Sequence, residues 1–139
     1  MNFNYKEYFE DLKDCKSIVL SSIDLDGYPA NRSMLVIKKK WSKEGIYFST
    51  NTSSEKIAHF LLNDKASIYY SDSNSFIGFY LRGKISIHQD IETKSMFWEE
   101  GDEKYYPLGK KDPDYSIIRF LPMNGKYYFR GKTVRFDSL

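Results

Sequence analysis

The interpretation of this chain rests on residues 48–56, which read Phe48-Ser49-Thr50-Asn51-Thr52-Ser53-Ser54-Glu55-Lys56. An apolar stretch ends here, six consecutive hydroxyl or amide side chains follow, and a helical pattern begins. One interpretation is an ordinary helix cap, because Thr52 and Glu55 have the spacing of a capping box. Capping needs one hydroxyl, however, and five are present. We favour a phosphate site, since a helix N-terminus offers free N–H groups and Lys56 adds a positive charge.

A second candidate residue lies upstream of this run. Arg32 comes early in an apolar stretch, residues 30–40, that has the pattern of a strand. We expect this strand to pair with the strand at 46–50 and to carry the guanidinium toward the helix that follows. A guanidinium there could bind a phosphate with two parallel hydrogen bonds. The alternative is a solvated arginine on a strand face.

The rest of the chain alternates short strand patterns with brief helical ones. We predict an amphipathic helix over residues 3–15 and short helices over 53–63 and 91–99. The predicted strands are 17–23, 30–40, 46–50, 66–71, 76–88, 115–121 and 126–137. Connections of hairpin length between most of them predict a mainly β protein of about seven strands, a small antiparallel β-barrel with short α-helices at its mouth, forming one domain over residues 1–139.

The balance of charges and the single cysteine indicate which classes of function and which compartment suit this chain. The 139 residues include 21 basic and 19 acidic side chains, and this balance argues against nucleic-acid binding through phosphate attraction alone. The alternative that keeps a nucleic-acid function is a small barrel that binds single-stranded nucleic acid through Lys38 to Lys40 and surface tyrosines. A single cysteine, Cys15, indicates a reducing compartment, and no apolar run is long enough to span a bilayer. We therefore expect a cytoplasmic protein.

The remaining polar and aromatic residues give weaker signals. His59 and His88 lie far apart and have no ligand spacing, so we expect packed or surface histidines and no metal site. Trp98 begins an aromatic segment, residues 98–109, beside an acidic run. This segment could close the barrel end as a lid, face a flat heterocycle or form a dimer contact.

Several motifs in this order resemble a known family. An arginine-led strand precedes Tyr47-Phe48-Ser49-Thr50-Asn51, with Ser54 and Lys56 after it. The supporting matches are Asp26-Gly27-Tyr28-Pro29, Arg82-Gly83-Lys84-Ile85-Ser86-Ile87, Trp98, Tyr106-Pro107-Leu108-Gly109, Asp112-Pro113-Asp114-Tyr115 and Gly125-Lys126-Tyr127-Tyr128. Over about residues 10–137 the chain is similar to the FMN-binding split barrel of the pyridoxamine 5′-phosphate oxidase-like superfamily, in the branch of general stress protein 26.

This resemblance implies a six- to seven-stranded antiparallel split β-barrel of the FMN-binding type, and a homodimer with FMN at the subunit interface. It implies that the flavin phosphate is held by Arg32, Ser49, Thr50, Ser54 and Lys56, and that the ring lies along the backbone of Met34, Leu35 and Val36. Ser33, Asn51 and Trp98 complete the implied cofactor-binding set. The implied activity is flavin redox chemistry on an unknown substrate, with a link to stress. A flavin sensor without turnover, or the same fold binding F420 or haem, are the alternatives.

The chain also departs from the true oxidases of this superfamily. Those enzymes carry a lysine five residues after the strand arginine, where this chain has Ile37, with Lys38 one residue later. One residue along a strand reverses the face on which a side chain lies. The Arg-x-His pair for the vitamin phosphate is also missing from the tail at 128–132. We therefore expect that pyridoxine phosphate is not the substrate.

Overall fold

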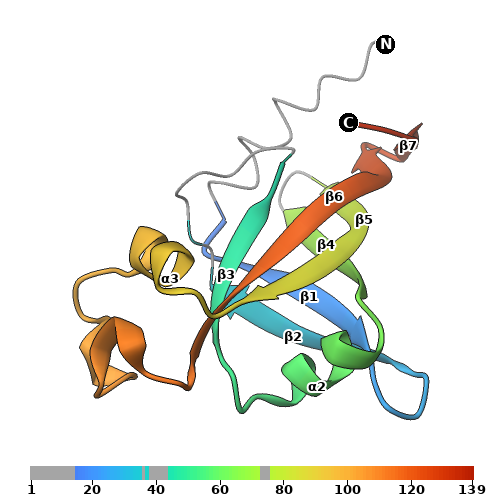
Figure 1. Cartoon of the computed structure of the whole chain (residues 1–139). Coiled ribbons are helices and arrows are strands. Elements are labelled where there is room, and N and C mark those ends of the chain that lie inside the picture. Colours follow the sequence, from blue (N-terminus) through green and yellow to red (C-terminus); the bar gives the residue numbers. More distant parts are fainter. Residues whose placement is uncertain (1–14, 36, 38–43, 73–75) are drawn as a thin grey trace.

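The computed structural model describes residues 15–35, 37, 44–72 and 76–139. The helix predicted over 3–15 thus lies outside the described residues, apart from Cys15. Within them, seven strands and two short α-helices form a curled antiparallel sheet (Figure 1). The strands are β1 (Ser17–Ile23), β2 (Pro29–Leu35), β3 (Ile46–Asn51), β4 (Lys65–Asp72), β5 (Ile77–His88), β6 (Tyr115–Phe129) and β7 (Lys132–Phe136). The predicted split-barrel fold is confirmed.

Burial alternates along most strands, which explains how the sheet curls around a core. In β1, for example, Ile18, Leu20 and Ser22 point inward while their neighbours stay partly or fully exposed. Leu20, Phe48 and Phe120 are fully buried in the main core cluster. This alternation is the period-two pattern of a half-buried strand.

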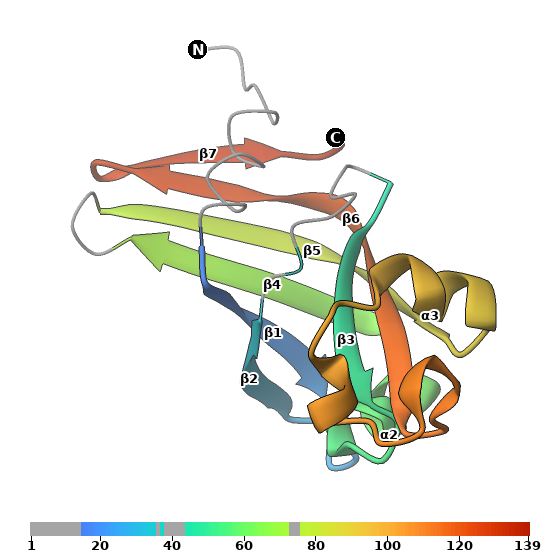
Figure 2. The same ribbon diagram turned by 90° about the vertical axis from the view of Figure 1, so that its left-hand side faces the viewer.

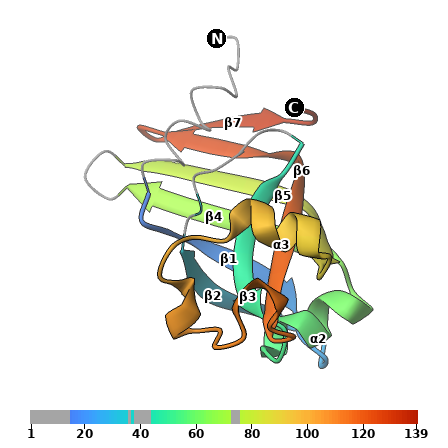
Figure 3. The ribbon, with the colours of Figure 1, turned by 60° about the vertical axis from the view of Figure 1, so that its left-hand side comes forward.

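The two α-helices cover different parts of the sheet (Figures 1 and 3). α2 (Glu55–Leu62) packs on β1, and α3 (Ile91–Phe97) packs on β6. A second apolar cluster, which includes Phe97, Tyr106 and Tyr115, lies under α3. Two 3₁₀ turns, η1 (Asp102–Lys104) and η2 (Gly109–Lys111), follow α3. Every helix within the described ranges is too short or too polar to cross a lipid bilayer.

The strand order corrects one prediction. The sheet runs β2-β1-β4-β5-β6-β3, so β2 and β3 are its two ends and do not pair with each other. β2 pairs with β1, and β3 pairs with β6. The prediction that the Arg32 strand pairs with the 46–50 strand is therefore wrong. Consecutive strands in a chain usually pair, and that tendency misled the prediction.

The structure also corrects the predicted strands 115–121 and 126–137. β6 runs unbroken through Phe129, and β7 covers only the end of the second predicted strand. On one side, β6 pairs with β5 from Ile117 to Phe129 without ending. On its other side, β3 pairs with the first part and β7 with the last, as the long β5–β6–β7 ribbon of Figure 2 shows. A β-bulge beside Pro122 marks the change of partner. Proline cannot donate a ladder hydrogen bond, so it is found at such irregularities.

Candidate functional site

A cavity of about 470 Å³ lies where the two ends of the sheet path meet. Its walls come from β2, β3, the start of α2 and the η1 region: Ser33, Met34, Leu35, Ser49, Thr50, Asn51, Ser54, Lys56, Asp102, Tyr105 and Tyr106. We call the line along which β2 and β3 both border this cavity the seam. Eight of the eleven predicted cofactor-binding residues line the cavity. Their convergence does not require β2 and β3 to pair.

A lysine and two hydroxyls form the polar end of the cavity. Lys56 Nζ donates to Thr50 Oγ1 at 2.7 Å and to Ser54 Oγ at 3.1 Å. Ser54 occupies the N-cap position of α2, yet its side chain makes no capping hydrogen bond. Thr52 donates instead to the carbonyl of Pro113, 2.8 Å away. The capping interpretation is therefore wrong, because Ser54 Oγ contacts a cation inside the cavity and Thr52 is used elsewhere.

Arg32 stands beside this group without lining the cavity. Its Nη1 donates to the carbonyl oxygen of Leu20 at 3.1 Å, which holds the half-buried side chain on the inner face of β2. The guanidinium is near enough for its charge to act on Lys56. The structure thus brings the two predicted cations together, Arg32 from β2 and Lys56 from the first turn of α2.

Electrostatics at this end favour an anion. Burial lowers the pKa of Lys56, and the positive charge of Arg32 lowers it further. Burial also lowers the pKa of Arg32, while the carboxylate of Glu55 opposes that shift. Lys56, whose charged form is disfavoured by burial and by a neighbouring cation, gains from a bound anion. The donors Lys56, Thr50 and Ser54 suit a phosphate group.

The side wall of the cavity is a strand edge. β2 pairs on one side with β1, and no second described strand pairs with it. Ser33, Met34 and Leu35 of this strand line the cavity, and Leu35 is 80% exposed. A free edge offers backbone donors and acceptors to a ligand. Val36, also predicted to contact the cofactor, lies outside the described residues, as do Lys38 to Lys40.

The sequence did not identify the individual residues of the wall that the segment after α3 forms. Asp102, Tyr105 and Tyr106 line the cavity from the segment that follows α3. The Tyr106 hydroxyl donates to Asn51 Oδ1 at 2.7 Å, which ties this segment to the end of β3. The aromatic run at 98–109 was the available signal, and the lid interpretation of it agrees with this placement.

Trp98 lies behind the cavity and does not line it. Its ring packs edge-on against Tyr115, with centroids 5.1 Å apart, and also contacts Tyr106. Burial raises the pKa of Tyr106 to about 12, and the carboxylates of Asp114, Asp102 and Asp112 contribute to that rise. This wall is therefore aromatic and negatively charged, in contrast to the Lys56 end.

Two backbone N–H groups of the hydroxyl run bind Asp114, just before β6. The Thr52 N–H donates to the Asp114 carbonyl at 2.7 Å, and the Ser53 N–H donates to Asp114 Oδ1 at 2.8 Å. The contact with Ser53 lowers the pKa of Asp114. The hydroxyl run is therefore fixed from both sides, by α2 and by the start of β6.

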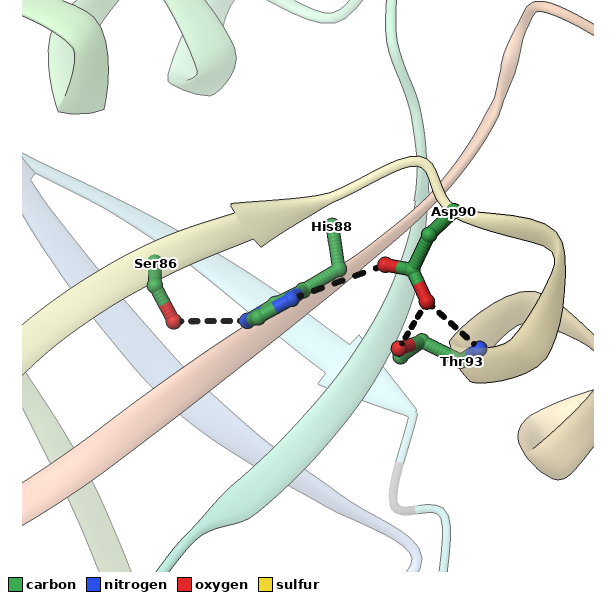
Figure 4. Close-up of polar contacts among 4 residues, drawn as sticks. All are labelled: Ser86, His88, Asp90 and Thr93. Atoms are coloured by element: carbon green, nitrogen blue, oxygen red, sulfur yellow. Dashed lines mark hydrogen bonds and ion pairs between the residues drawn. The ribbon is translucent and has the colours of Figure 1, made fainter.

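The two histidines lie outside the cavity. His59 is buried, and its Nδ1 is 2.7 Å from Ser22 Oγ under α2. His88 Nε2 is 2.8 Å from Ser86 Oγ, and His88 Nδ1 is 3.8 Å from Asp90 Oδ1 (Figure 4). The order Ser-His-Asp is that of a hydrolase triad, but 3.8 Å is too long for the orienting hydrogen bond.

Asp90 also has a structural role that explains its position. Its carboxylate accepts hydrogen bonds from the N–H and the hydroxyl of Thr93 and so caps α3 (Figure 4). These hydrogen bonds lower the pKa of Asp90. Over the described ranges, no group of three or more His, Cys, Asp or Glu side chains is arranged to hold a metal ion.

Comparisons with known proteins identify the family. The sequence matches the family "Pyridoxamine 5'-phosphate oxidase like" over residues 4–136. A solved structure from Clostridium acetobutylicum, described as related to general stress protein 26 of B. subtilis and of the pyridoxinephosphate oxidase family, is 33% identical, with a TM-score of 0.84 over 97% of this chain and 96% of that one. General Stress Protein 26 from Bacillus anthracis str. Sterne shares the fold at 21% identity, with a TM-score of 0.74 over 96% of this chain and 100% of that one. The curated proteins contain no match. A cavity at a split-barrel seam and a family match over nearly the whole length agree: the chain belongs to the pyridoxamine 5′-phosphate oxidase-like family, in the general stress protein 26 branch.

Proposed function

We propose that this chain binds FMN in the seam cavity and uses it for redox chemistry on a small molecule in the cytoplasm. One observation carries the proposal: Lys56, Thr50 and Ser54 meet within hydrogen-bond distance at one end of a cavity whose side wall is a free strand edge. The lysine and the two hydroxyls suit a phosphate, and the strand edge suits a flat ring that packs along it. Both occur in one space of about 470 Å³, within the usual size range of ligand pockets.

The residues present fit this cofactor. Lys56 and the two hydroxyls would hold the phosphate, and Arg32 would contribute a second positive charge. The edge of β2 at Met34 and Leu35 would support the ring, with Tyr105 across from it. Bound FMN would supply the electron transfer, whereas the chain's own residues bind, orient and shield it.

We also propose that the protein is a homodimer that completes the cavity from a second copy. Leu35 is 80% exposed and Tyr105 is 75% exposed, although both line the cavity. Large apolar side chains left exposed at a binding site are typical of a surface that another chain covers. Sedimentation equilibrium should give twice the chain mass of 16.4 kDa. A monomer at all concentrations would contradict the dimer but not the cofactor.

The first experiment is an absorbance spectrum of the purified protein, before and after FMN is added and the sample is desalted. Flavin bands that survive desalting support the proposal. Bands of F420 or haem in the protein as purified would instead identify the alternative cofactors. A protein that is colourless as purified and retains no flavin bands after FMN is added and the sample is desalted would overturn the proposal. Reduction of bound flavin by NADH or NADPH, followed by reoxidation, separates an oxidoreductase from a flavin sensor.

Variants test the residue assignment. Lys56→Ala should weaken FMN binding about 10- to 100-fold, because hydrogen bonds to a charged group contribute about 1.5–3 kcal/mol. Arg32→Ala should weaken it by a smaller factor, since Arg32 acts next to the cavity. Lys132→Ala, an exposed lysine on β7, is the control of equal charge change. Flavin affinity that is the same in all three variants would refute the phosphate site.

A further inference from the structure

A second hollow is lined by residues of β5, β6 and β7 and of the segment that follows β7. It encloses about 180 Å³ and shares no lining residue with the seam cavity. Three cations from three adjacent strands line it: Arg82, Lys126 and Arg135. Among the described residues that line it, Asp137 is the one carboxylate. The hollow therefore carries a net positive charge.

The pairing of the strands makes this charge costly without a ligand. Lys126 and Arg135 are directly opposite each other in the β6–β7 ladder. Like charges at opposed positions of a sheet destabilise it. No ion pair with a carboxylate neutralises Arg82, Lys126 or Arg135 in the part of the chain that the structure describes. Lys126 and Arg135 are opposed in the ladder and share the hollow with Arg82, so a bound anion would relieve their repulsion.

An irregular stretch of β5 and β6 determines how Arg82 is held beside this hollow. The β-bulge between β5 and β6 falls at Arg82 and Gly83, and Gly125 follows it on β6. A side chain at Gly125 would begin 2.0 Å from the carbonyl oxygen of Tyr80, so the two strands approach closely only because glycine is there. Arg82 Nε donates to Asn124 Oδ1 at 2.8 Å, which fixes the guanidinium beside the bulge.

From these observations we infer that the hollow is an oxyanion site for the phosphate or sulfate group of a small organic ligand. Arg82 keeps its two terminal nitrogens for the ligand, because Asn124 contacts only Nε. Lys126 and Arg135 supply the other donors. Tyr80 is the aromatic residue with a hydroxyl that lines the hollow, and we expect it to contact the ligand's organic part. A volume of about 180 Å³ equals that of about six waters, enough for a phosphate and a small ring.

The test is an NMR titration of the full chain carrying Lys56→Ala, which weakens the seam cavity. Sodium phosphate and phenyl phosphate are added at constant ionic strength, with sodium chloride as the blank. The Gly125 amide and the Arg82 Nε–H should shift and saturate with both phosphates, and phenyl phosphate should bind more tightly. Tyr80→Ser should remove that difference. Equal affinity for the two ligands in the protein that retains Tyr80 would show that the site binds a free anion and would overturn the assignment to an organic ligand.

Charge variants complete the test. Arg135→Gln should weaken phosphate binding about tenfold or more, and Lys132→Gln, on the same strand but outside the hollow, should not. Without phosphate, Arg135→Gln should leave the Tm unchanged or raise it, since it relieves the repulsion with Lys126. Equal weakening by both variants, the absence of any saturable shift, or much tighter binding of an oligothymidylate would overturn the assignment. Lys126→Gln repeats the comparison if Arg135→Gln does not fold.

Discussion

Lys56 combines two roles that depend on its protonation. It donates to Thr50 and Ser54, and burial and Arg32 both lower its pKa. An anion bound beside it would favour the charged form, so anion binding and protonation reinforce each other. This reciprocity makes the residue sensitive to pH in a range where an exposed lysine is not.

We predict that FMN affinity falls as the pH rises through the lowered pKa of Lys56. The free protein loses the Lys56 proton at a lower pH than an ordinary lysine does, and the neutral amine attracts phosphate weakly. Lys56→Arg should keep the affinity to higher pH, because arginine stays charged. Equilibrium titrations at stepwise increasing pH measure this. The prediction fails if both proteins lose affinity over the same pH range.

Tyr106 gives a prediction about stability at high pH. Its pKa rises from 10.0 to about 12 on folding, so between these values the unfolded chain has lost a proton that the folded chain keeps. The unfolded state then binds fewer protons, and the free energy of unfolding falls as the pH rises from 10 to about 12. Tyr106→Phe should make this fall less steep in urea unfolding.

The same variant has an effect at neutral pH. Tyr106→Phe removes the hydrogen bond to Asn51 and should cost about 0.5–1.5 kcal/mol. Tyr105→Phe is the control, because the Tyr105 ring is 75% exposed. An alkaline slope that is the same in the parent and Tyr106→Phe would refute this account.

Sequence reasoning located the cation end of the cavity better than its opposite wall. The hydroxyl run and Lys56 were found because the end of a strand pattern and the start of a helical pattern can be read locally. Arg32 was placed beside them through a pairing of its strand with the 46–50 strand that the sheet does not contain. Asp102 and Tyr105 come about fifty residues later in an irregular segment, whose path depends on contacts such as Tyr106 with Asn51. Such long-range contacts leave no periodic signal in the sequence.

At the scale of elements, β6 shows why strand limits are hard to predict. Pro122 and Gly125 have the composition of a turn, so the sequence indicated two strands. The chain instead continues, because β5 pairs along its whole length and the bulge takes up the irregularity. The turn comes later, where Arg130 and Gly131 both adopt positive φ. The break in the sequence pattern marks a change of partner from β3 to β7.

We predict that Gly125→Ala is among the most damaging small substitutions in the chain. The added methyl would lie 2.0 Å from the Tyr80 carbonyl oxygen, so two strands must separate. The free energy of unfolding should fall by about 3 kcal/mol or more. Gly101→Ala is the control: its φ is +100°, but nothing lies within 4 Å, so only backbone strain of about 1–2 kcal/mol is expected. Equal losses in urea unfolding would contradict the close approach.

For the whole molecule, the seam makes ligand binding a stabilising contact between strands far apart in the sheet order. FMN would contact both β2 and β3, which no hydrogen-bond ladder joins. FMN at one hundred times its Kd should add about 2.7 kcal/mol to the free energy of unfolding. Amide hydrogen exchange should slow at Met34 and at Asn51 together. Slowing on only one side would show that the ligand does not bridge the seam.

The seam also determines how fast a ligand can arrive. In a closed barrel, a ligand waits for strand pairs to break before it reaches the interior, and its binding rate levels off at the opening rate. Here the cavity borders edges of β2 and β3 that pair with no further described strand, so no strand pair within the protomer has to break, and arrival is limited by diffusion and orientation. In stopped-flow experiments, the observed rate should rise linearly with FMN concentration and show no plateau. An incomplete barrel has fewer strand pairs to stabilise it, but a ligand can enter it without breaking any of them.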